Sequence, residues 1–337
     1  MQGFLRRLGR WLGLAMAGLA ALLAVLLVLG REPDRTVESL KARYASPASR
    51  FVEVLPGTLV HVRDEGPRDG RPVLLLHGSN ASLHTWEPWV VRLTAAGYRV
   101  VTLDLPAHGL SGPSADRDYS YAGYVRVVDA LVGKLGLARL AIGGNSMGGG
   151  VAWLWATRHP DRVAALLLLD STGEPAPPGT SSPLGAKLAK VPVVREIMAS
   201  VTPRWIIERS LVQSVSVKEM VTPEMVDRYW ELLLYPGTRE ATLDRFSQYA
   251  PLPDGEALRQ LKAPALLLWG AEDRLVPTSG AQWFAERLPD ARVSLLGGVG
   301  HIPMEEAPDR SVAPALEVLA RGDWEDGQDR QGLFQLR

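Results

Sequence analysis

The chain has 337 residues, which is enough for one large α/β domain with an insertion or for two ordinary domains. It carries 37 basic and 37 acidic residues, and this balance argues against a nucleic-acid-binding protein. It has no cysteine, which excludes disulfides, cysteine nucleophiles and thiolate metal sites.

The N-terminal segment has the pattern of a membrane anchor. Residues 11–30 carry no charged side chain, and Arg6, Arg7 and Arg10 precede them. A helix of this length is about 30 Å long, which matches the hydrocarbon core of a bilayer. The stretch ends without a small-x-small cleavage site, so we expect an uncleaved single-pass anchor, with a cleaved signal peptide and secretion as the alternative. The three arginines predict a cytoplasmic N-terminus and an extracytoplasmic domain.

After a polar tether at residues 31–50, apolar strands alternate with helical segments. Residues 51–55 and 58–63 flank a Pro-Gly pair and predict an antiparallel hairpin. The continuous apolar runs that follow are typical of strands buried on both faces of a parallel sheet. We therefore expect an α/β fold with a doubly wound, mostly parallel sheet. The expected strands are 72–77, 98–105, 140–142, 163–169, 264–270 and 292–296, and the expected helices are 86–96, 121–135 and 308–321.

The alternation breaks between residues 174 and 262. This stretch opens with several prolines and continues as four helical, aromatic-containing segments. We expect a helical cap inserted into a core that comprises residues 51–173 and 263–321. Additional core helices are the alternative. Residues 322–337 are charged and predict a loose C-terminal tail.

One strand-to-helix junction has the pattern of a nucleophile elbow. The apolar run Leu140–Ile142 leads into Gly144-Asn145-Ser146-Met147-Gly148, and a helical segment follows. A serine on so sharp a turn has strained backbone geometry, so the residues two positions away must lack side chains. The first N–H groups of the helix then face an oxyanion formed on the attacked carbonyl. A structural glycine-rich turn is the alternative. A phosphate loop is disfavoured because no Gly-Lys-Ser/Thr follows.

A serine nucleophile needs a base and an acid that orients the base. Of the six histidines, His301 lies in a glycine-rich loop directly after the last strand. Strand ends are where open α/β sheets bind ligands, which favours His301 as the base. Asp273 follows the strand that ends at residue 270 and is the expected acid, whereas Asp170, at the end of an earlier strand, is its rival. The order Ser146, Asp273, His301 is that of an α/β-hydrolase.

Five motifs together resemble the α/β-hydrolase superfamily over residues 51–321. They are HGSN at 77–80, DLPAHG at 104–109, GNSMGG at 144–149, GAEDRLVP at 270–277 and GVGHIP at 298–303. The resemblance implies Ser146 as nucleophile, Asp273 as acid and His301 as base. It implies oxyanion-hole N–H groups from Met147 and from Ser79 or Asn80. The serine separates the chain from the superfamily's dehalogenases and epoxide hydrolases, which have aspartate at the elbow.

The expected activity is hydrolysis of carboxylic esters through an acyl-enzyme, as in the esterase and lipase-like branch of the superfamily, with a lipid-like or medium-chain ester as substrate. One alternative is hydrolysis of a carbon–carbon bond in a ring-fission product, because GNSMGG also occurs in such enzymes. Their longer glycine-rich oxyanion loop is absent here. A non-catalytic binding protein is the other alternative. We expect no cofactor and no metal ion. The residues expected to contact substrate are His84, Trp86, Trp205 and Trp230.

Overall fold

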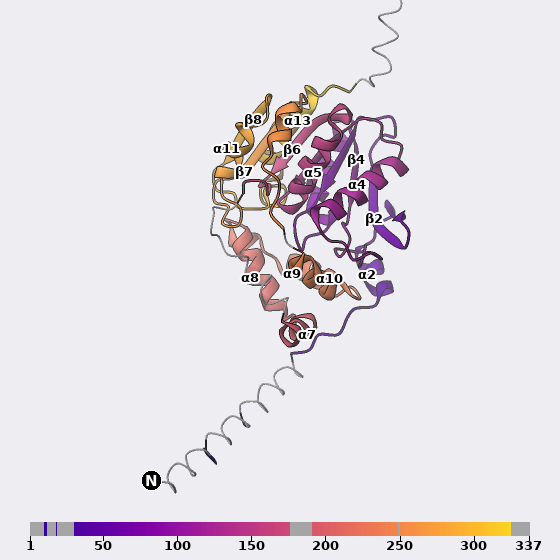
Figure 1. Cartoon of the computed structure of the whole chain (residues 1–337), viewed down its shortest axis with the longest axis vertical. Coiled ribbons are helices and arrows are strands. Elements are labelled where there is room, and N and C mark those ends of the chain that lie inside the picture. Colours follow the sequence, from indigo (N-terminus) through magenta and orange to yellow (C-terminus); the bar gives the residue numbers. More distant parts are fainter. Residues whose placement is uncertain (1–9, 12–17, 19–29, 176–190, 249, 325–337) are drawn as a thin grey trace, which may run out of the picture.

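The structure is a computed structural model that describes residues 10–11, 18, 30–175, 191–248 and 250–324. In this part of the chain, eight strands form one sheet in the order β1-β2-β4-β3-β5-β6-β7-β8 (Figure 1). Strand β2 pairs antiparallel with both of its neighbours, whereas all the other pairs are parallel. The predicted mostly parallel sheet is confirmed. The strands are β1 Ser49–Leu55, β2 Thr58–Glu65, β3 Pro72–Leu76, β4 Arg99–Leu103, β5 Leu140–Asn145, β6 Val163–Leu169, β7 Ala265–Gly270 and β8 Ala291–Leu296.

Helices cover both faces of the sheet, and this explains why the central strands β3 and β6 are apolar along their whole length. On one face, α3 (Glu87–Ala95) and α13 (Pro308–Ala320) pack against Val73 and Leu75 of β3. On the other face, α4 (Tyr121–Lys134), α5 (Met147–Arg158) and α11 (Ser279–Ala285) form a second cluster that includes Leu74 and Leu76. Because successive side chains point to opposite faces, a strand covered on both sides needs apolar residues at every position.

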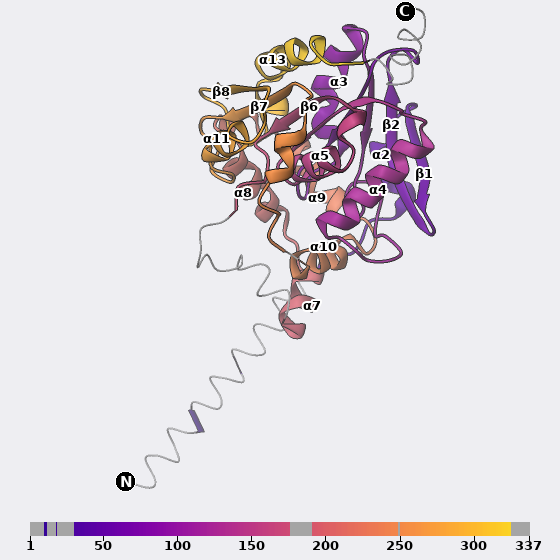
Figure 2. The same ribbon diagram turned by 45° about the horizontal axis from the view of Figure 1, so that its top comes forward.

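The inserted segment forms helices, as the sequence predicts. They are α7 Pro192–Ser200, α8 Arg204–Ser214, α9 Pro223–Leu233 and α10 Thr238–Ser247. Figure 2 shows α7 and α10 at the opposite end of the molecule from α13. The cap touches the loop after β8, where the N–H of His301 donates a hydrogen bond to the carbonyl of Ser214 at 2.7 Å. Residues 176–190, which enter the cap, lie outside the described part.

Part of the predicted tether is a strap that binds the cap. The N–H of Glu32 donates to the carbonyl of Ser200 at 3.0 Å, and Asp34 pairs with Arg239 of α10 at 2.6 Å. A short helix, α2 (Val37–Tyr44), then packs its apolar side against Leu232 of α9. The sequence predicted a tether or strap here without this helix, and the last two residues of the predicted tether belong to β1.

The predicted anchor at residues 11–30 falls almost entirely outside the described residues, and it therefore stays a prediction. Among the residues that are described, no helix has the length and apolar character needed to cross a membrane. The predicted loose tail is also mostly outside this part. Its first residues are described, and Trp324 packs beside the ring of Tyr98, with the ring centroids 6.0 Å apart.

Directly after β4, the buried carboxylate of Asp104 joins three segments of the core. Its Oδ2 contacts His61 Nδ1 at 2.7 Å and accepts from the N–H of Leu110 at 2.9 Å, while Oδ1 accepts from the N–H of Leu83 at 2.7 Å. Burial acts to raise the pKa of Asp104, but the hydrogen bond and the electrostatic interaction with His61 outweigh it and hold the pKa below its ordinary value.

We expect Asp104→Ala to lower the free energy of unfolding by about 3–5 kcal/mol, because it leaves buried donors without their acceptor. Urea denaturation at neutral pH measures the loss, and the exposed Asp161→Ala is the control, with an expected change within about 0.5 kcal/mol. Since the folded-state pKa is depressed, the stabilisation is complete above the unfolded-state pKa of about 3.9 and is lost as the pH falls through the folded-state value. A loss similar to that of the control would contradict this role.

Candidate active site

The junction between β5 and α5 has the strained geometry of a nucleophile elbow. Ser146 has φ 53° and ψ −119°, and it is the only residue between the strand and the helix. Such a backbone is unfavourable for a residue with a side chain and persists only when its surroundings hold it in place. A Cβ on Gly144 would lie 2.3 Å from the backbone of Gly148, and a Cβ on Gly148 would lie 2.2 Å from the carbonyl oxygen of Leu76. Both glycines are therefore required by close backbone approach.

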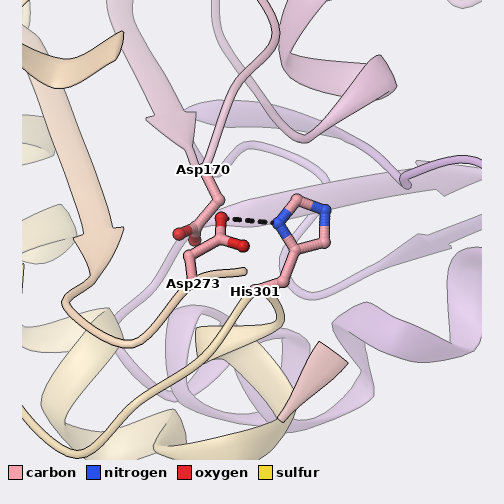
Figure 3. Close-up of side chains that lie close together, drawn as sticks. All are labelled: Asp170, Asp273 and His301. Carbon is pink, nitrogen blue, oxygen red and sulfur yellow. Dashed lines mark hydrogen bonds and ion pairs between the residues drawn. The ribbon is translucent and has the colours of Figure 1, made fainter. Parts of the chain in front are cut away.

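The loops after β7 and β8 bring the predicted acid and base together. His301 Nδ1 lies 2.7 Å from Asp273 Oδ2 (Figure 3). The other oxygen, Asp273 Oδ1, accepts from the N–H groups of Leu275 and Val276 at 2.7 and 3.2 Å. Burial acts to raise the pKa of Asp273, but the hydrogen bond and the electrostatic interaction with His301, together with the two N–H groups, lower it overall. Asp273 is thus an ionised acceptor that fixes one ring nitrogen of His301 and leaves Nε2 for proton transfer.

Asn145, the last residue of β5, connects the elbow to the histidine loop. Its amide Nδ2 donates to the carbonyl of His301 at 2.9 Å and to that of Leu169 at 3.2 Å. Within the described residues, no hydrogen bond joins Ser146 Oγ to the His301 ring. In structures without substrate such catalytic contacts are often long. The Asn145 bond nevertheless fixes the backbone of the base relative to the strand that carries the serine.

Two carboxylates, Glu306 and Glu272, also fix the loop that carries His301 by accepting hydrogen bonds from its backbone. Glu306, on the short helix α12 (Pro303–Glu306), accepts from the N–H of Gly300 at 2.7 Å and from the N–H and hydroxyl of Ser216 in the cap at 2.8 and 2.6 Å. Glu272 accepts from the N–H of Val299 at 2.8 Å. No motif in the sequence singles out Glu306. Its role arises from a cap segment that is distant in the chain.

The predicted oxyanion residues lie around the serine. Met147 is the first residue of α5, a position whose N–H has no acceptor within the helix. The loop after β3 runs over the elbow, because a Cβ on Gly78 would lie 3.3 Å from the Cβ of Ser146. Ser79 and Asn80 follow in this loop, and Asn80 has a positive φ of 59°. The arrangement can present N–H groups from both segments to a carbonyl oxygen bound at Ser146.

Sequence reasoning missed Arg245, a cap residue that reaches this loop. Its Nη1 donates to Ser79 Oγ at 2.5 Å and contacts Met147 Sδ at 3.6 Å, while Nη2 donates to Asn80 Oδ1 at 2.8 Å. The side chain is buried, and burial lowers the pKa of Arg245. No nearby sequence feature signalled this residue, because helix periodicity does not reveal which cap face meets the core.

The four predicted substrate contacts are scattered. His84 is buried, and its Nδ1 lies 2.7 Å from Glu87 Oε1. Both residues line an open cleft of about 610 Å³ between the core and α9. Trp86 is fully enclosed in the core cluster beside α3, which gives it a packing role. Trp205 is 59% exposed on α8, and Trp230 donates from Nε1 to the carbonyl of Thr202 at 2.8 Å. The structure does not gather these side chains at Ser146, and their contact with a substrate remains a prediction.

The elbow, the acid–base pair at neighbouring strand ends and the eight-stranded sheet define the class of protein, a hydrolase of the α/β fold. The sequence model of the family described as "alpha/beta hydrolase fold" matches residues 71–308. The chain therefore belongs to the α/β-hydrolase family, as the sequence motifs predicted.

The chain is also similar to individual known proteins. The chain is 30% identical over 289 residues to a 2-hydroxy-6-oxononadienedioate/2-hydroxy-6-oxononatrienedioate hydrolase of Burkholderia vietnamiensis, an alignment that covers 82% of this chain and 97% of the relative. It is 28% identical to a 2-hydroxymuconate semialdehyde hydrolase of Pseudomonas putida, over 79% of this chain and 92% of the relative. Among solved structures, a bacterial membrane phospholipase A superposes with a TM-score of 0.67 at 26% identity, over 95% of this chain and 98% of that one.

Proposed function

We propose that the protein is a serine hydrolase that cleaves a carbon–carbon bond in an anionic, conjugated product of aromatic ring fission. The similarity to hydrolases of 2-hydroxy-6-oxo dienedioates supports this alternative over the ester hydrolysis expected first from the sequence. The observation that carries the proposal is the buried guanidinium of Arg245 beside the oxyanion loop. The substrates named for those relatives carry carboxylates, and a carboxylate is the partner that this cation lacks.

Within the described residues, Arg245 differs from the other buried and half-buried arginines on helices α8 to α10 in having no acidic partner. Arg204, Arg228 and Arg239 each pair with a carboxylate. Arg245 is only 9% exposed, its partners are neutral, and its buried Nε has no hydrogen-bond partner among the described residues. Removing a charge from water without a counter-charge costs several kcal/mol. A substrate carboxylate bound at the guanidinium would offset this cost in the complex.

The proposed reaction begins as in other serine hydrolases. His301 accepts the hydroxyl proton of Ser146 while the oxygen bonds to the ketone carbon of the substrate. The carbonyl electron pair moves onto oxygen, and the N–H of Met147 and an N–H of the loop after Gly78 stabilise this oxyanion. Each such donor contributes about 3 kcal/mol to transition-state stabilisation. Asp273 stabilises the imidazolium that forms.

Breaking a carbon–carbon bond requires that the departing carbon disperse its electron pair. In a 2-hydroxy-6-oxo dienoate that carbon is a vinyl carbon, so the substrate must first change to its diketo tautomer, in which the 2-hydroxyl has lost a proton and the carbon next to the ketone has gained one. When the bond to the ketone carbon then breaks, its electron pair is delocalised through the remaining double bond onto the 2-oxo oxygen. When the oxyanion collapses, the carbon–carbon bond breaks, the fragment takes up a proton from His301, and an acyl group stays on Ser146. Water activated by His301 then releases the acyl group as a carboxylic acid. The cation of Arg245 would stabilise the anionic fragment.

We expect Arg245→Met to reduce kcat/KM for a 2-hydroxy-6-oxo dienoate by about 30-fold or more, because it leaves the substrate carboxylate without its cation. Turnover of the corresponding neutral methyl ester should change much less. Arg239→Met is the matched control, since it removes a buried arginine of the same helix that pairs with the strap. Equal losses on the charged and the neutral substrate would show that Arg245 supports only the oxyanion loop, and would remove the observation that carries the proposal.

A second candidate is hydrolysis of a lipid-like carboxylic ester. It is favoured by the likeness to a membrane phospholipase A, which extends over 95% of this chain and so beyond the shared hydrolase region. The proposed triad would attack an ester carbonyl in the same way, and the alcohol would leave after protonation by His301. Every phospholipid also carries an anionic phosphate, so the charge of Arg245 does not separate the two candidates. Release of fatty acid from phospholipid vesicles does.

We further propose that residues 11–30 anchor the protein in a membrane, with the N-terminus in the cytoplasm and the hydrolase domain outside. The arginines before the uncharged stretch and the likeness to a membrane enzyme support this location. A reporter fused after Arg337 should be active only outside the cytoplasm. Activity of the reporter in the cytoplasm would rule the topology out, and soluble protein cleaved near Gly30 would favour a signal peptide.

A further inference from the structure

The described residues contain one buried carboxyl group at the site that the proposed reaction does not use. Asp170 directly follows β6, is fully buried and has a positive φ of 46°. Its backbone N–H donates to the carbonyl of Leu268 at 2.9 Å, which fixes the turn against β7. Figure 3 shows its carboxyl group beside that of Asp273, on the side away from the His301 ring.

The hydrogen bonds around Asp170 leave one oxygen unexplained. Oδ1 accepts from the N–H of Gly270 at 2.9 Å, but Oδ2 has no partner among the described residues. Ligand-type atoms of Asp170, Asp273 and His301 lie within 4.8 Å of one another. Two carboxylates this close and shielded from water repel each other strongly, and such a pair ordinarily retains one proton.

We propose that Asp170 is a neutral carboxylic acid whose Oδ2–H donates a hydrogen bond to the Asp273 carboxylate, and that it acts as a positioning residue for the catalytic acid. This assignment supplies the missing partner of Oδ2 and adds a donor to those that already hold Asp273. It builds on the proposed triad, because positioning Asp273 matters only if Asp273 orients His301. Asp170 itself does not contact the reacting atoms.

The surrounding charges favour the proton on Asp170 over the proton on Asp273. Burial and the charge of Asp273 raise the pKa of Asp170 well above its ordinary value, and Glu306 acts in the same direction. Asp273 has His301 and two N–H donors, whereas Asp170 has only the N–H of Gly270. The group with more donors keeps the negative charge.

Two variants of the full-length protein test the proposal. Asp170→Asn keeps a donor in place of the acid O–H, whereas Asp170→Leu has similar bulk and no donor. The rate at which a fluorophosphonate probe labels Ser146 measures the triad without knowledge of the natural substrate. We expect Asp170→Asn to keep this rate within about threefold and Asp170→Leu to lose about tenfold or more. Thermal unfolding of both variants controls for loss of folding.

The protonation state has its own readouts. The carbonyl stretch of a protonated carboxyl group should appear in the infrared spectrum of the wild type at pH 8 and be absent from Asp170→Asn. The labelling rate falls as the pH is lowered, and the pH at which it falls should be the same in Asp170→Asn as in the wild type, because a neutral group replaces a neutral group. If Asp170 were ionised, removing its charge would move this fall in the labelling rate to lower pH by about one unit or more. The infrared band would then also be missing from the wild type. Either result overturns the proposal.

These readouts also separate this proposal from the others. If Ser146 is not labelled at all, the proposed triad fails, while the infrared band still reports on Asp170. The same three groups have the spacing of a metal site, so the labelling rate is also measured with EDTA and with added Zn²⁺ or Mg²⁺. Loss of labelling in EDTA that Zn²⁺ or Mg²⁺ restores would assign Asp170 to a metal and overturn the proposal, whereas no effect agrees with it.

Discussion

Asp273→Asn is expected to reduce kcat by about ten-thousand-fold with little change in overall structure. The amide can donate where the carboxylate only accepts, so it favours the histidine tautomer that cannot take the serine proton. The contact at stake is the 2.7 Å pair between Asp273 Oδ2 and His301 Nδ1. Steady-state kinetics with p-nitrophenyl acetate measure the loss independently of the natural substrate.

Asp170→Asn is the matched control for this substitution, because Asp170 lies beside Asp273 and was its rival as the catalytic acid. The structure places Asp170 against Asp273 and not against the His301 ring (Figure 3). We therefore expect Asp170→Asn to lose far less activity. The reverse ranking would move the acid to the end of β6 and would contradict the proposed triad.

Ser146→Ala is expected to reduce kcat by about a million-fold and to abolish labelling by a fluorophosphonate. Alanine removes the attacking oxygen and no other polar contact of the elbow, since the backbone of residue 146 makes the bonds to Leu169 and Thr172. The fold should therefore remain, which circular dichroism and thermal unfolding check. Ser171→Ala, at a hydroxyl near the elbow that the mechanism does not use, is the control.

Residual labelling or near-normal turnover in Ser146→Ala would identify another nucleophile. If the wild-type protein is correctly folded but shows no turnover and no labelled serine, the remaining alternative, a non-catalytic binding protein on a hydrolase scaffold, is favoured.

The sequence predicted the sheet well because each strand carries a local signal. The runs at residues 72–76 and 163–169 are apolar at every position, and burial between two helical layers is the physical reason. The elbow was also predictable, since the glycines on both sides of Ser146 are dictated by backbone contacts less than 3 Å from where a Cβ would stand. The order of serine, acid and histidine then selected Asp273 and His301.

The parts that could not be predicted depend on contacts between distant segments. Arg245 reaches the predicted oxyanion residues only because α10 lies over the loop after β3. Glu306 holds the cap residue Ser216 and the histidine loop at once, and neither contact leaves a periodic pattern in the chain. Helix α2 was read as tether because it is short and polar, and its helical state depends on packing against α9.

The residues that the sequence predicts to contact substrate show the same limit. Aromatic residues near a site are usually core, and a sequence does not distinguish the two roles. Trp86 is enclosed in the core cluster beside α3, and Trp205 is exposed on α8. A residue's distance from Ser146 is set by tertiary packing, so composition alone could not place these side chains.

The most direct test of the central claim compares two substrates with the same full-length enzyme. One is a 2-hydroxy-6-oxo dienedioate, followed by loss of its visible absorbance, and the other is a phospholipid in mixed micelles, followed by release of fatty acid. The account predicts a kcat/KM at least about a hundred-fold higher for the dienedioate and products that show cleavage of the carbon–carbon bond. Efficient release of fatty acid with an unchanged dienedioate would contradict it and establish the protein as an ester hydrolase.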